Sequence, residues 1–237
     1  MFMYKYVIII IALLSFSNPL FACTKFCTVD DQPIERYDYI WKELRGFYGR
    51  YMPKKITVEY VSEKGGSFDV QSELIRAMID GPDYIVAHEA CHVALGKMTK
   101  GVSNTENFRF IDEGWASIFG TWFNEYKNTY KRTSIREALK MKSEKGISFE
   151  DVKSWTSYFG PWKIASVGEN QRNYKAYSVG SSFVYYLIDN YGDKKLKKFF
   201  IKLGQIRDLD KTLQKVYKKT SSQIEKEWMN NLVDYRP

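Results

Sequence analysis

Histidine is scarce in this chain of 237 residues, which contains only two, His88 and His92. Any metal or catalytic site that needs three histidines is therefore excluded. Long apolar runs are scarce too, and the run from Tyr6 to Phe16 is too short to span a bilayer comfortably. The sequence shows no internal repeat and no long linker, so we expect residues 32–237 to form a single domain.

Residues 1–22 are typical of a signal peptide. Lys5 gives a short positive start, the apolar run follows, and Asn18 and Pro19 interrupt it. Cleavage after Ala22, lipoprotein processing at Cys23 and an uncleaved anchor are the three alternatives. Each predicts an exported protein of the cell envelope or periplasm, or a secreted one.

The three cysteines leave two arrangements open near the N-terminus. Cys23 could carry a lipid and act as a membrane tether, or it could form a disulfide with Cys27, which an exported protein permits. Residues 23–31 are predicted to be a short tether or a capped loop. The third cysteine, Cys91, is expected to be a small buried residue.

The net charge of +8 becomes 8 − 1 = +7 once residues 1–22 are removed, because Lys5 is the only charged residue there. This balance suits an anionic surface or an acidic substrate, or nothing specific, and we expect no nucleic-acid partner. An aromatic content of 16% indicates a well-filled core, an aromatic cleft or both.

Hydrophobic periodicity predicts an α+β fold that is mainly helical, with a small N-terminal sheet and an all-helical C-terminal half. Residues 56–60 and 67–71 are the predicted strands, paired as a hairpin or as part of a small sheet. Helices are predicted at residues 34–47, 85–95, 108–126, 131–145, 151–155, 174–191, 193–204, 209–217 and 221–235. Residues 155–173 are predicted to be irregular, and they either line the cleft or pack on the core.

The two histidines lie four residues apart, with Glu89 directly after the first. On a helix this spacing places both imidazoles on one face, about 5–6 Å apart at Cβ, within reach of one ion. Glu89 then lies beside the ion and could take a proton from water. The H-E-x-x-H pattern is typical of zinc metalloproteases. The alternative is a buried helix that carries two hydrogen-bonded histidines.

A catalytic zinc ion commonly has three protein ligands, so the third must here be a carboxylate or a thiolate. Glu113 is the best candidate because it follows His92 by 21 residues, enough for a loop and a returning helix. Small residues on its face would allow that helix to approach closely. Glu113 could instead be a first-turn acid that favours the helix dipole. Asp112 is the second candidate ligand, or a partner that holds a histidine N–H.

The segments HEACH and DEGWA together resemble the gluzincin metallopeptidases, in particular the peptidase MA-like group with a thermolysin-like catalytic core. The segment from Ala176 to Leu187, the pair Tyr191-Gly192 and the segment from Ser221 to Trp228 are similar to that group's C-terminal half. The resemblance covers residues 55–235 and implies a zincin-like catalytic domain. The chain lacks the G-x-M-E-N element of the larger aminopeptidases, which favours an endopeptidase.

The resemblance also implies roles for individual residues. One Zn²⁺ per chain would be held by His88, His92 and Glu113, with Glu89 as general base and then proton donor. Tyr177 would stabilise the oxyanion, or it would only pack on the core. Peptides or proteins would be the substrates, and the strand near residues 66–69 could pair with an extended peptide. The competing hypothesis is a non-catalytic envelope protein, binding or structural, that retains the fold.

Overall fold

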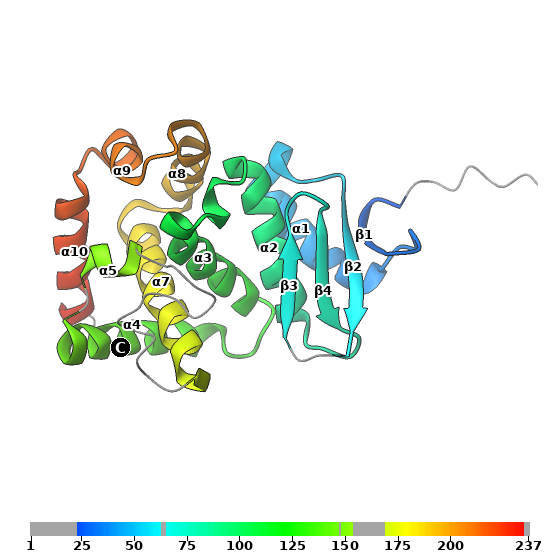
Figure 1. Ribbon diagram of the computed structural model, residues 1–237, viewed down its shortest axis with the longest axis horizontal. Coiled ribbons are helices and arrows are strands. Elements are labelled where there is room, and N and C mark those ends of the chain that lie inside the picture. The colour runs from blue at the N-terminus through cyan, green and yellow to red at the C-terminus, as the bar shows by residue number, and fades with distance from the viewer. Residues whose placement is uncertain (1–22, 63–64, 147, 154–168, 235–237) are drawn as a thin grey trace, which may run out of the picture.

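The computed structural model describes residues 23–62, 65–146, 148–153 and 169–234 (Figure 1). The predicted signal peptide and residues 154–168 of the predicted irregular segment lie outside these ranges. The strands are β1 (Lys25–Thr28), β2 (Lys55–Val61), β3 (Gly66–Asp69) and β4 (Leu74–Met78). The helices are α1 (Asp38–Tyr48), α2 (Asp83–Thr99), α3 (Arg109–Thr121), α4 (Lys127–Lys145), α5 (Phe149–Lys153), α7 (Glu169–Tyr191), α8 (Asp193–Ile206), α9 (Leu209–Tyr217) and α10 (Ser221–Asp234).

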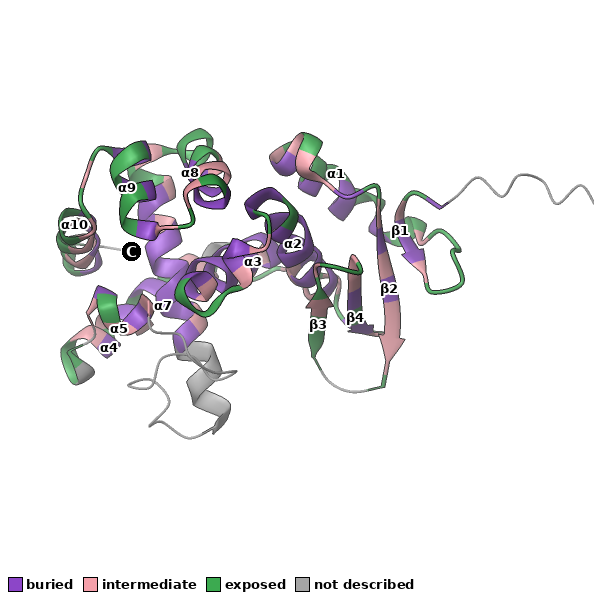
Figure 2. Cartoon of the chain, turned by 45° about the horizontal axis from the view of Figure 1, so that its top comes forward, coloured by how far each residue is buried: buried purple, intermediate pink, exposed green. Residues whose placement is uncertain are grey.

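The fold is α+β: α1 lies between β1 and β2 in the chain, and in the described part of the chain the elements after β4 are all helices. Helix α2 lies between the two parts, contacting β3 and β4 on one side and α3 and α8 on the other (Figure 1). It is apolar almost all round, and most of its residues are buried. Buried positions also concentrate on α3 and α7, so the core runs through these three helices (Figure 2).

Of the two predicted arrangements for residues 56–60 and 67–71, the hairpin is wrong, whereas membership of one small sheet is confirmed. The strand order is β1-β2-β4-β3, so β4 lies between the two, parallel to β2 and antiparallel to β3. The reason lies in polarity, since β4 buries Ile75 and Ala77 whereas β3 carries the exposed Ser67 and Asp69. A polar strand suits the edge of a sheet, where one side remains open to solvent.

Residues 23–31 are not the predicted tether. Residues 25–28 form β1, which pairs parallel to β2, and Phe26 packs edge-on against Tyr37 and Trp41 with ring centroids 5.5 Å away in each case. Cys23 and Cys27 form a disulfide. Of the two arrangements that the sequence leaves open, the structure therefore has the one in which the Cys23 sulfur is bonded to another cysteine.

Several helix ends differ from prediction. Helix α7 already begins at Glu169, inside the segment predicted to be irregular. Helix α2 continues to Thr99 and ends where Lys100 adopts a left-handed conformation with φ of 55°. Gly96 therefore does not terminate the helix, and a Cβ there would lie 2.6 Å from Val70 and 2.7 Å from Asn104. No helix in the described part of the chain combines the length and apolarity needed to cross a membrane.

Candidate metal centre

Helix α2 brings its two histidines together as the spacing predicts. The Nε2 atoms of His88 and His92 are 3.0 Å apart, and the rings meet edge-on with centroids 4.6 Å apart. His92 is fully buried, whereas the His88 side chain is 20% exposed. The pair therefore forms one wall of a site that is closed on the His92 side and accessible on the His88 side.

Glu113 completes a triangle of donor atoms. Its Oε2 lies 3.3 Å from His88 Nε2 and 3.2 Å from His92 Nε2. Ligands bound tetrahedrally at about 2.0–2.1 Å are about 3.3 Å from one another, so the triangle has the size of one face of a zinc site. The Oε2 atom is buried and has no hydrogen-bond partner among the described residues. An orphaned carboxylate oxygen facing two imidazole nitrogens fits a bound cation.

Arg109 orients this carboxylate. Its Nε and a terminal NH₂ group donate to Oε1 of Glu113 over 3.3 and 3.2 Å, one helical turn away on α3. The interaction occupies Oε1 and leaves Oε2 facing the histidines. Burial raises the pKa of Glu113, but His92 and His88 outweigh it and bring the pKa below its usual range. Arg109 was not among the residues expected from the sequence, although its position four residues before Glu113 was visible.

Asp112 lies outside the triangle of donor atoms and instead contacts His92, as the alternative interpretation predicts. Its Oδ2 lies 2.9 Å from His92 Nδ1, and a carboxylate can only accept, so Nδ1 carries the proton and donates. The Nε2 atom is thereby aimed at the triangle. Asn104, also missed, donates from Nδ2 to the same Oδ2 over 2.9 Å. Burial lowers the pKa of His92, but Asp112 and Glu113 outweigh it and raise the pKa, so protons compete with a cation for Nε2.

Strand β3 forms the other wall. The Phe68 ring stacks on His92 with centroids 4.2 Å apart and planes at 18°. A Cβ on Gly66 would lie 2.6 Å from Glu89 Oε1, so only glycine permits the strand to approach the carboxylate this closely. Strand β3 thus contacts both His92, through Phe68, and Glu89, at Gly66.

Glu89 has the surroundings of a proton acceptor rather than a surface acid. It is only 7% exposed, and this burial raises its pKa, while His88 and His92 act in the opposite direction. A raised pKa makes this carboxylate a stronger base than an ordinary surface acid, which suits the uptake and return of a proton.

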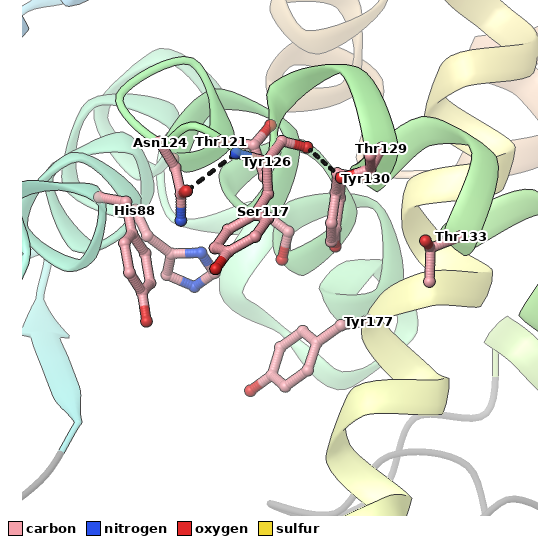
Figure 3. Close-up of a pocket in the computed structure, with 11 residues that line it drawn as sticks. His88, Ser117, Thr121, Asn124, Tyr126, Thr129, Tyr130, Thr133 and Tyr177 are labelled. Carbon is pink, nitrogen blue, oxygen red and sulfur yellow. Dashed lines mark hydrogen bonds between the residues drawn. The ribbon is translucent and has the colours of Figure 1, made fainter.

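Tyr177 lies on the far side of the site. It projects from α7, with its ring centroid 6.3 Å from that of His88 (Figure 3). The position of α7 is fixed by a backbone crossing with α3, since a Cβ on Gly114 would lie 2.4 Å from the Gly180 backbone. Ser181 and Val184 are buried behind it, whereas Tyr177 is partly exposed. Tyr177 therefore faces the site rather than only the core.

Two adjoining cavities meet at these residues. One, of about 290 Å³, is lined by Glu89 and Gly66 among others. The second, of about 480 Å³, extends from His88 toward the start of α4 (Figure 3). Both are lined by Tyr84, His88, Ser117 and Tyr177. Together they provide a cleft in which a chain of residues could pass the triangle of donor atoms.

Comparison with known proteins gives no further guidance, because no family model, no curated protein and no solved structure matches this chain.

Proposed function

We propose that this protein is an exported zinc metallopeptidase with a zincin-like catalytic domain, and that His88, His92 and Glu113 hold one Zn²⁺ per chain. The observation that carries the proposal is the triangle of Nε2, Nε2 and Oε2 atoms, with edges of 3.0, 3.2 and 3.3 Å, beside a buried carboxylate. His₂Glu with one open position is the ligand set of a catalytic zinc ion rather than a structural one.

Bound zinc supplies polarisation of the scissile carbonyl and a lower pKa for water. Glu89 accepts the proton of the attacking water and passes it to the departing amine nitrogen, which the raised pKa of this carboxyl group favours. Tyr177 is the proposed hydrogen-bond donor to the oxyanion, because both histidines are engaged at the triangle. A single such donor contributes about 3–4 kcal/mol to transition-state stabilisation.

The sheet edge provides a place for the peptide. β3 is an outer strand that pairs with β4 along one edge, so among the described strands its other edge has no partner (Figure 1). An extended substrate added along β3 would pass Gly66 and Glu89 with its backbone hydrogen-bonded to the strand. This arrangement recognises main chain, which suits an endopeptidase.

Export is part of the proposal. Residues 1–22 supply the signal, and the Cys23–Cys27 disulfide suits an oxidising compartment such as the cell envelope or the medium. Lipidation of Cys23 would require this disulfide to be absent. Mass measurement of the mature N-terminus separates the two.

The test compares wild type with Glu89→Gln. The matched control is Glu106→Gln, which replaces an exposed acid between α2 and α3. We expect about one zinc per chain in all three. Cleavage of a peptide library should fall about 10²–10⁴-fold in Glu89→Gln only, the usual loss for a general base. Zinc retention without cleavage of any peptide by wild type would favour the non-catalytic envelope protein.

A further inference from the structure

We infer that the 480 Å³ cavity beside His88 binds one uncharged side chain of the substrate, of up to aromatic size, next to the scissile bond, and rejects charged ones. The inference rests on the proposed peptidase function and specifies its substrate.

The cavity is positioned to receive a residue adjoining the reacting carbonyl. His88 lines it directly, and it shares Tyr84, Ser117 and Tyr177 with the smaller cavity that contains Glu89. A peptide bond held at the donor triangle would therefore have this cavity within reach of one flanking side chain. Figure 3 shows the lining side chains converging from the ends of α3 and α4 and from α7.

The lining carries no formal charge among the described residues, apart from His88 itself. Its polar groups are hydroxyls and an amide, contributed by Ser117, Thr121, Asn124, Thr129 and Thr133. A charged side chain that entered would lose part of its hydration and gain no partner of opposite sign from this lining, which is unfavourable.

The basic residues near the start of α4 are directed elsewhere. Lys131 forms an ion pair with Asp189 at 2.7 Å, and Lys127 lies 5.7 Å from the centroid of the Trp122 ring. The whole chain has a net charge of +8, but neither of these two lysines places its positive charge in the cavity.

The volume of the cavity and its aromatic lining indicate how large a substrate side chain it can hold. The volume is in the lower part of the range of about 300–1,000 Å³ for ligand pockets, enough for one large side chain. Tyr84 and Tyr126 are 39% and 59% exposed at its margin and offer ring faces. Inside, the Tyr130 hydroxyl is hydrogen-bonded to Ser181 Oγ over 3.0 Å, so this polar group of the lining is already satisfied without a charged substrate group.

The experiment uses a library of peptides prepared by digesting proteins. Cleavage sites in this library are mapped for wild type, Thr133→Asp and Thr133→Asn. We expect wild type to exclude Lys, Arg, Asp and Glu at one of the two positions flanking the cut. Thr133→Asp should raise kcat/KM for Lys or Arg there by about tenfold over neutral residues, equivalent to about 1.4 kcal/mol of attraction. Thr133→Asn has the same shape without the charge, so it should not show this gain.

Charged residues at both flanking positions as often as neutral ones in wild type would overturn the inference while leaving the peptidase function intact. The same conclusion would follow if a folded Thr133→Asp, checked by thermal unfolding, kept the wild-type preferences. Absence of any cleavage by wild type would remove both the function and the inference.

Discussion

Replacing Arg109 with methionine removes the guanidinium group that donates to Oε1 of Glu113, while keeping a long apolar side chain on α3. The carboxylate could then rotate or present both oxygens, and Oε2 would no longer be held toward His88 and His92. We therefore expect the affinity for zinc to fall, with little change in the fold. Arg109→Lys should retain part of the effect, since a single ammonium group replaces the planar fork.

The geometry sets the magnitude. Loss of a residue that orients a metal ligand typically lowers metal affinity about 10–100-fold. Both donor–acceptor distances, 3.3 and 3.2 Å, exceed the roughly 2.7–2.9 Å of strong charge-assisted hydrogen bonds. The Arg109 side chain is also 31% exposed, which screens its charge. We therefore expect the lower end, about tenfold, which corresponds to about 1.4 kcal/mol.

The assay is competition of the metal-free protein against a chelator of known zinc affinity at fixed pH. Thermal unfolding in excess chelator checks that the metal-free fold is intact. Arg136→Met, an exposed arginine on α4, is the control for loss of a positive charge. A zinc affinity for Arg109→Met within twofold of wild type would refute the assignment of Arg109 as the residue that positions Glu113.

Three other substitutions test separate parts of the structure. Gly66→Ala should push Glu89 from its place, because the added Cβ would lie 2.6 Å from Oε1, and we expect kcat/KM to fall by up to about 100-fold with zinc retained. Gly180→Ala places a Cβ 2.2 Å from a carbonyl oxygen of α3, and about 2 kcal/mol of overpacking should lower Tm by about 4–8 °C. Lys219 lowers the pKa of Glu227 by hydrogen bonding, and a lowered pKa gives stability that is present above the unfolded-state pKa and lost in acid. The stability difference between wild type and Glu227→Gln should therefore be larger at pH 7 than at pH 3, measured by denaturant unfolding.

Matched controls exist for each substitution. Gly46→Ala, in α1, has no heavy atom within 4 Å of the new Cβ and should leave both activity and Tm unreduced. Glu43→Gln removes an exposed acid on the same helix and is the control for loss of a carboxylate. If Gly66→Ala had the same kcat/KM as wild type, Glu89 would not have been displaced. That result would contradict the close contact between β3 and Glu89.

The helix that carries both histidines could be predicted because its signals are local. The i, i+4 spacing, the apolar surroundings and the proline before Asp83 all lie within a few turns. Glu113 could be predicted because the chain has no third histidine, and Asp112 because it is adjacent to Glu113. These inferences need residue type and spacing only.

Other parts depend on contacts that spacing does not encode. Asn104 reaches Asp112 only through the conformation of the loop between α2 and α3. Strand β4 has just Ile75 and Ala77 as buried positions, so its alternation is too short to stand out, although it occupies the sheet interior. Phe68 stacks on His92 because β3 is the outer strand of the sheet. The predicted hairpin would instead have placed β3 directly beside β2.

Because both imidazoles of the protein belong to one cluster, histidine resonances are a background-free spectroscopic report on it. Labelling histidine with ¹⁵N in the ring alone would give four nitrogen signals, two from each imidazole. The Nδ1 proton of His92, buried and shared with Asp112, should exchange slowly with water and resolve as its own peak. Titration of such a sample with zinc or acid would follow each nitrogen of the cluster separately, in the intact full-length fold.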